Sequence, residues 1–205
     1  MLPPDLFAAL IAFAFVTSVT PGPNNMMLLA SGVNHGFTRT IPHMLGISVG
    51  FSGMIVAVGF GIGQVFVLYP QTYLALKVIS IVYMLWLAWK IATSGPLSSG
   101  MGEAVGQPMT FVQAAAFQWV NPKAWTMALG AISAYTVATD YTKSLLIVGA
   151  VFIVVNFPTV SFWTMFGVGL RRWLTDSEKV RIFNITMALL LVASLAPIII
   201  GMCLT

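Results

Sequence analysis

The chain is a series of long apolar runs separated by short polar stretches. The first run extends from Leu6 to Thr38, 33 residues without an Asp, Glu, Lys or Arg. Further charge-free runs cover residues 40–76, 144–170 and 182–205. Each run exceeds the about 20 residues that an α-helix needs to cross a bilayer. The runs are continuous, which favours membrane helices over the short alternating strands of a barrel.

These runs predict an all-α integral membrane protein with six transmembrane helices. The expected spans are residues 6–33, 40–67, 72–93, 109–136, 144–170 and 180–203. A turn-rich linker at about residues 94–108 separates repeat 1 (residues 1–93) from repeat 2 (residues 109–205). Each repeat holds an odd number of spans, so the two insert with opposite orientation, as inverted repeats do. We expect residues 1–205 to form a single transmembrane transporter domain.

The first and fourth predicted spans are each interrupted. The first contains Thr20-Pro21-Gly22-Pro23-Asn24-Asn25, and the fourth contains Gln118-Trp119-Val120-Asn121-Pro122-Lys123. A proline in a helix interior removes a backbone hydrogen bond and costs about 3 kcal/mol. Backbone groups freed at membrane depth are tolerated only where protein buries them or a polar cavity solvates them. Interruptions at matching positions of two halves are typical of a transporter's binding site.

The residues at these interruptions are the candidate substrate site. An upstream half-helix ends in free carbonyls, which suit an ammonium group, and a downstream half begins with free N–H groups, which suit a carboxylate. One site with both matches a zwitterion such as an α-amino acid. The predicted substrate-binding residues are Thr20, Gly22, Asn24, Asn25, Gln118, Asn121, Lys123 and Asn156. The predicted helix-breaking residues are Pro21, Pro23 and Pro122.

Lys123 is the one fully charged residue placed deep inside a predicted span, whereas Lys77, Lys90 and Arg181 lie near span ends. A charge at the bilayer centre costs at least about 2.5 kcal/mol on insertion scales and marks function by default. The alternative is that its ammonium reaches an interface along the flexible stem. Its place directly after Asn121-Pro122 favours a functional or site-structuring role. Other polar residues have an alternative role in pairing freed backbone groups, which we expect for Thr17 and Ser18.

Two further features concern packing. The second span carries small residues at spacings of three and four, which allow close helix contacts in lipid: Gly46, Gly50, Gly53, Ala57 and Gly61. In the fifth span, Asn156-Phe157-Pro158 is a weaker third interruption, which an ordinary proline kink also explains.

Composition excludes several classes of function. Of 205 residues, 59% are hydrophobic and 7% are charged, whereas soluble domains carry about 25% charged residues. The net charge of +4 comes from basic residues at helix ends, which indicates membrane topology rather than nucleic-acid binding. Cys203 is the only cysteine, so we expect neither a dithiol pair nor a cysteine-based metal cluster. No cofactor or metal is expected. The expected partners are the lipid bilayer and a small zwitterion, and a homodimer is compatible with the sequence.

Basic residues also predict the orientation. The loops after the first, third and fifth spans contain or adjoin Arg39, Lys90, Arg171, Arg172, Lys179 and Arg181. The opposite face has only Lys77 and Lys143, so the positive-inside rule places both termini outside the cytoplasm. His35 and His43 lie near the cytoplasmic end of the second span. Their spacing is poor for a metal, which favours helix-end or interfacial roles and leaves a proton relay open.

At these motifs the chain resembles the lysine exporter (LysE/RhtB) superfamily of bacterial amino-acid efflux carriers. The matching segments are Thr20-Pro21-Gly22-Pro23-Asn24, Gly32, His35-Gly36, Gly46, Gly50, residues 83–90 and residues 117–124. Pro23-Asn24-Asn25 and residues 88–94 are most similar to the cysteine and O-acetylserine exporters. The resemblance implies a multi-pass carrier of the bacterial cytoplasmic membrane. It would export small neutral amino acids or their derivatives, including the threonine and homoserine class, by proton-coupled alternating access.

Two other functions were weighed against this one. A metal or inorganic-ion efflux protein of the same superfamily would need intramembrane carboxylates or thiolates, and no Asp or Glu lies in a predicted span. A membrane-embedded enzyme would need converging Asp, His or metal-ligand sets, and the sequence offers none. We therefore expect a carrier and no enzyme.

Overall fold

Helices make up nearly all of the chain that the computed structural model describes, which is residues 2–93, 107–174 and 176–203. No β-strand occurs in these ranges. The α-helices are α1 (Pro4–Val19), α2 (Pro23–His35), α3 (Phe37–Ala57), α4 (Gln64–Leu68), α5 (Pro70–Ala92), α6 (Phe111–Phe117), α7 (Pro122–Tyr135), α8 (Tyr141–Leu170), α9 (Ser177–Ala193) and α10 (Ala196–Cys203).

The first predicted span is two helices, α1 and α2, bent by 57°. Thr20-Pro21-Gly22 links them, and we call this link the first break. Pro23 is the first residue of α2, where the missing proline N–H would have no helical partner anyway. The proline therefore starts a helix rather than kinking one.

The fourth predicted span is divided in the same way. A short 3₁₀ helix, Gln118–Val120, follows α6, and with Asn121 it forms the second break before Pro122 begins α7. The Asn121 side chain accepts a hydrogen bond from the Lys123 N–H at 3.1 Å, which caps α7. The predicted interruptions of the first and fourth spans are therefore both present in the structure.

The second predicted span is not the single rod expected over residues 40–67. A π-helical segment, Val58–Ile62, follows α3 and leads into the short helix α4. Gly61 has φ 121°, a conformation that residues with a Cβ rarely adopt. The span also begins earlier than expected, because Gly36 with φ 79° makes the turn from α2 to α3 in one residue.

The fifth span shows the opposite difference. The 30-residue helix α8 runs through Pro158 without a break, so Asn156-Phe157-Pro158 is not a third interruption. The Thr159 and Ser161 hydroxyls donate to carbonyls one turn back, at 2.7 Å in each case. Such hydroxyls are one means by which membrane helices tolerate an interior proline.

Three helical stretches among the described residues are long and apolar enough to cross a membrane: Phe37–Ile62, Leu74–Ala92 and Ala138–Leu170. The bent α1–α2 pair makes a fourth if it counts as one span. The sequence predicted six. The remaining two regions are shorter pieces, because the second break divides α6 from α7 and a turn at residues 194–195 divides α9 from α10.

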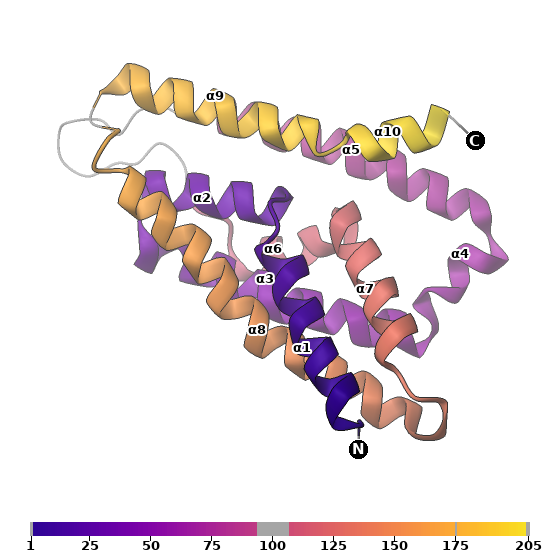
Figure 1. Cartoon of the computed structure of the whole chain (residues 1–205). Helices are drawn as coiled ribbons and strands as arrows, with labels where there is room; N and C mark the ends of the chain where they lie inside the picture. Colours follow the sequence, from indigo (N-terminus) through magenta and orange to yellow (C-terminus); the bar gives the residue numbers. More distant parts are fainter. Residues whose placement is uncertain (1, 94–106, 175, 204–205) are drawn as a thin grey trace.

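Helix α8 packs against α1, α2 and α3, and Figure 1 shows it running diagonally across the molecule, while α5 and α9 lie side by side. Two glycines allow α2 and α8 to touch. A Cβ on Gly32 would lie 2.2 Å from the Thr164 carbonyl oxygen, and one on Gly167 would lie 2.3 Å from that of Leu29. This contact fixes α2, and with it the downstream side of the first break.

The small-residue stripe of the second span is only partly used for packing. Gly46 and Gly50 lie against α6, where a Cβ would come within 2.4 and 2.5 Å of Phe111 and Ala115 backbone atoms. A Cβ on Gly53 or Gly61 would meet nothing within 4 Å. Only the first half of the stripe, Gly46 and Gly50, therefore packs α3 against α6, the helix before the second break.

Gly32→Ala and Gly53→Ala form a matched pair of variants, since both exchange a helical glycine for alanine. We expect Gly32→Ala to destabilise the folded carrier by about 1–3 kcal/mol, because the methyl group overlaps α8. Gly53→Ala should be neutral or slightly stabilising, since it meets open space and favours the helix. Thermal unfolding in detergent, followed by size-exclusion chromatography, compares the two. Equal melting temperatures would contradict this packing.

Candidate functional site

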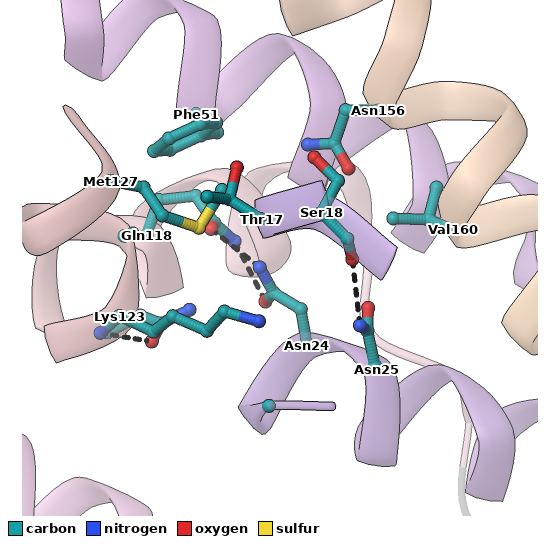
Figure 2. A pocket seen from close by; sticks show the side chains of 13 residues that line it. Thr17, Ser18, Asn24, Asn25, Phe51, Gln118, Lys123, Met127, Asn156 and Val160 are labelled. Carbon is teal, nitrogen blue, oxygen red and sulfur yellow. Dashed lines mark hydrogen bonds between the residues drawn. The ribbon is translucent and has the colours of Figure 1, made fainter. Parts of the chain in front are cut away.

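The two helix breaks meet. Asn24, at the start of α2, and Gln118, in the second break, form a reciprocal amide pair (Figure 2). Asn24 Nδ2 donates to Gln118 Oε1 at 2.9 Å, and Gln118 Nε2 donates to Asn24 Oδ1 at 3.2 Å. Gln118 is fully buried and also donates to the Ala114 carbonyl at 2.9 Å. Both amides are therefore held in fixed orientations at the centre of the protein.

Lys123 joins the breaks a second time. Its Nζ donates to the Thr20 carbonyl at 2.5 Å and lies 3.5 Å from the Pro21 carbonyl. The lysine stem crosses Gly22, where a Cβ would come within 2.7 Å of Lys123 Cδ. The glycine of the first break is thus needed for a close approach of the lysine. An ammonium group already occupies the carbonyls just beyond the end of α1.

The other carbonyls near the end of α1 are also paired. Asn25 Nδ2 donates to the Ser18 and Thr20 carbonyls, both at 2.9 Å. The Trp163 indole N–H donates to the Val19 carbonyl at 3.2 Å. The α1 backbone is therefore satisfied by side chains from α2, α7 and α8 rather than by a continuing helix. Asn25 has the backbone-pairing role that the sequence left as an alternative for these polar residues.

A small cavity, here called the break cavity, lies where these groups converge. Its volume is about 30 Å³, which is room for about two water molecules. Its walls are formed by Thr17, Ser18, Gly22, Asn24, Asn25, Phe51, Gln118, Asn121, Lys123, Ala124, Met127, Asn156 and Val160. An amino acid does not fit without movement of these walls, so the structure holds the site closed.

The structure brings together seven of the eight residues predicted to bind substrate. Those on the cavity wall are Gly22, Asn24, Asn25, Gln118, Asn121, Lys123 and Asn156. Thr20 is not among them, because its side chain is exposed and its hydroxyl donates to the Val16 carbonyl at 2.5 Å. Thr20 instead contributes its own carbonyl to Lys123.

The sequence missed several wall residues. Phe51 comes from α3, Met127 from α7 and Val160 from α8, and each reaches the cavity through packing that no local motif encodes. Thr17 donates to the Phe13 carbonyl at 2.6 Å, one turn back inside α1, which is not a carbonyl that the prolines release, so the expected backbone role is not seen for Thr17. For Ser18 that expectation is wrong, since its buried hydroxyl has no hydrogen-bond partner.

Charge at the cavity is one-sided. Lys123 is the one charged residue among the wall residues, and Asn24, Asn25, Gln118, Asn121 and Asn156 supply uncharged amides. Within the described ranges, no group of three or more His, Cys, Asp or Glu side chains is placed to hold a metal ion. Carbonyl and amide oxygens alone would also suit a hard cation, but the ammonium of Lys123 among them repels one, so this set of groups favours a small polar molecule.

The fold and this site define a membrane translocator, and comparison with known proteins agrees. Residues 15–196 match the LysE type translocator family, and the chain belongs to that family. It is 31% identical over 192 residues to cysteine/O-acetylserine efflux proteins of Escherichia coli K12 and Shigella sonnei Ss046. These matches cover 92% of this chain and 95% of each relative. No solved structure matches. The protein is therefore a multi-pass membrane transporter and not an enzyme.

A double-mutant cycle tests the amide pair. Asn24→Ala or Gln118→Ala alone should destabilise the protein by about 1–3 kcal/mol, because the first leaves the buried Gln118 side-chain oxygen without its partner and the second leaves the half-buried Asn24 amide without its partner. The double variant should cost less than the sum of the two, with a coupling of about 0.5–3 kcal/mol. Thermal unfolding of the four proteins measures this. Additive losses would show that the breaks are not joined here.

Proposed function

We propose that the protein is a secondary carrier that exports small neutral amino acids from the cytoplasm. The observation that carries this proposal is the ammonium of Lys123 on the carbonyls of the first break. That position accepts a primary ammonium group, which every α-amino acid of proteins except proline carries. The similar efflux proteins are named for cysteine and O-acetylserine, which supports small neutral amino acids and their derivatives as the substrate class.

Binding would exchange one ammonium for another. The α-ammonium of the substrate would take the Thr20 and Pro21 carbonyls, and the displaced Lys123 would pair with the substrate carboxylate. Charge-assisted hydrogen bonds are about twice as strong as neutral ones, so the exchange retains strong contacts at both ends. The amides of Asn24, Gln118 and Asn156 would contact the remainder of the molecule.

The closed break cavity fits one stage of an alternating-access cycle. A site with a volume of about 30 Å³ must widen before it admits an amino acid. The movement of Lys123 from the carbonyls to the substrate carboxylate would accompany this widening. Broken helices at a central site, with two halves moving about it, are common among secondary transporters. Proton antiport as the energy source rests on family resemblance alone.

The proposed setting is the bacterial cytoplasmic membrane, with six spans in two inverted repeats and both termini outside. One break in each half supports this arrangement. So do the basic residues, since Arg171 lies beside the Gly36 turn, with its Nη1 3.9 Å from a Cβ built on that glycine. The turn after α2 and the end of α8 therefore form one basic end of the molecule, expected in the cytoplasm.

Transport by Lys123→Met in proteoliposomes is the direct test. The variant should fold but lose about ten- to hundredfold in transport of labelled O-acetyl-L-serine, the equivalent of a charge-assisted hydrogen bond of about 1.5–3 kcal/mol. The matched control is Lys143→Met, which removes an exposed lysine 3.9 Å from Asp140 and should transport normally. Undiminished transport by Lys123→Met at equal incorporation would reject the proposed site.

Gly22→Ala tests the same site without altering any charge. The added methyl group would displace the lysine stem, so transport should fall while the protein keeps its net charge and its amide pair. Transport equal to wild type, measured in the same proteoliposomes, would show that the close approach of Lys123 to the first break is unimportant for function.

Reporter fusions test the orientation. Alkaline phosphatase fused after Thr205 should be active, because that enzyme folds only outside the cytoplasm, and green fluorescent protein at the same position should be dark. The reverse pattern would overturn the predicted topology.

A further inference from the structure

A second and larger cavity lies at the other end of α2. Its volume is about 430 Å³, within the range of small-molecule binding sites. Ser31, Asn34 and His35 of α2, His43 of α3, and Leu87 and Lys90 of α5 are among its wall residues. Asn34 is ten residues beyond Asn24 of the break cavity, which at 1.5 Å per residue is about 15 Å along the same helix.

The wall of this cavity carries polar atoms that no protein group satisfies. His43 is only 2% exposed, and neither ring nitrogen has a hydrogen-bond partner. Asn34 Oδ1 and His35 Nδ1 are likewise buried and unpartnered. Each such atom costs about 1–3 kcal/mol unless water or a ligand pairs with it. Unsatisfied groups from two neighbouring helices around one cavity indicate a site for a polar molecule.

The charge of this wall indicates whether it binds the carboxylate end or the ammonium end of an amino acid. Lys90 is a wall residue, with its Nζ 4.6 Å from the centre of the Trp86 ring. No Asp or Glu occurs among the wall residues that the structure describes, and Arg171 lies close to the Gly36 turn that follows His35. The surroundings are basic, so they favour a carboxylate over an ammonium.

One apolar cluster, here called the apolar layer, reaches from the wall of the larger cavity to the residue beside the break cavity. Met27 is a wall residue of the larger cavity, while Phe117 directly precedes Gln118 of the break cavity. Both are buried and belong to one apolar cluster with Met84 and Leu87. Methionine is unbranched and flexible, so it can move without disturbing the helix that carries it.

We propose that the larger cavity is the cytoplasmic vestibule of the carrier, where the carboxylate end of a small amino acid binds first, and that Met27 and Phe117 form the gate to the break cavity. This inference rests on the proposed function and adds a second binding site, an entry direction and a gate. It also gives the buried His43 and the half-buried His35 a role: they line the entry, and the substrate or its water pairs with their nitrogen atoms.

A single-cysteine experiment tests the vestibule. Cys203 is the only natural cysteine, so Cys203→Ser gives a cysteine-free parent into which Ser31→Cys is introduced. An anionic, membrane-impermeant thiosulfonate should label this cysteine in inside-out vesicles and not in right-side-out vesicles. O-acetyl-L-serine should slow the labelling at least threefold. Ser177→Cys, exposed at the start of α9 in the loop predicted to be cytoplasmic, is the control and its labelling should be unaffected by the amino acid.

Two outcomes overturn the vestibule: labelling from the outer face, or a labelling rate that O-acetyl-L-serine does not change. Should Ser31→Cys fail to fold, Leu87→Cys on the opposite wall is used with the same expectations. Transport by the Cys203→Ser parent separates the two proposals. A parent that moves O-acetyl-L-serine while Ser31→Cys is not protected rejects the vestibule alone, and a wild-type protein that moves none rejects the proposed function and the vestibule with it.

Met27→Trp tests the gate. The larger side chain should fill the apolar layer and lower transport at least tenfold, while O-acetyl-L-serine still protects Ser31→Cys in the same protein. Met26→Trp, at the neighbouring buried position of the same cluster, is the control for overpacking and should retain more transport. Equal transport by Met27→Trp and wild type would overturn the gate.

Discussion

Backbone carbonyls and N–H groups released inside a bilayer must find partners within the protein, and in this chain they find them across the two breaks. Lys123 pairs with the Thr20 carbonyl, Asn25 with those of Ser18 and Thr20, and Trp163 with that of Val19. Pairing within a single helix would have left these segments as separate rods. Because the partners come from other helices, the need to pair these backbone groups holds the helices together at the centre of the carrier.

The same contacts explain why the centre is small and closed. A lysine stem across Gly22 and a reciprocal amide pair leave only about 30 Å³ between the breaks. The larger cavity, about 430 Å³, lies toward the basic end of α2. A closed central site beside an open cavity is the arrangement expected of one conformational state in an alternating-access cycle. A ligand shifts such an equilibrium only if it binds one state more tightly, and the ammonium exchange at Lys123 would supply that difference.

Much of this centre could be predicted from sequence, because a proline in a membrane span leaves few backbone conformations in which every polar group has a partner. Pro23 and Pro122 located both breaks, and the polar residues beside them proved to be neighbours. The π-helical segment at Val58–Ile62 was not predicted, and the sequence left open whether Pro158 interrupts its helix or only kinks it, since each depends on what packs around it. Phe51 was missed for the same reason: it reaches the cavity from a helix distant in sequence, and an isolated apolar residue in a span carries no local signal.

The most direct measurement is an experimental structure of the carrier in lipid nanodiscs with O-acetyl-L-serine bound. We predict that the amine of the ligand lies within hydrogen-bond distance of the Thr20 and Pro21 carbonyls, and that the Lys123 ammonium has moved to its carboxylate. A ligand bound elsewhere, with Lys123 still on the Thr20 carbonyl, would contradict the claim that the two breaks form the substrate site.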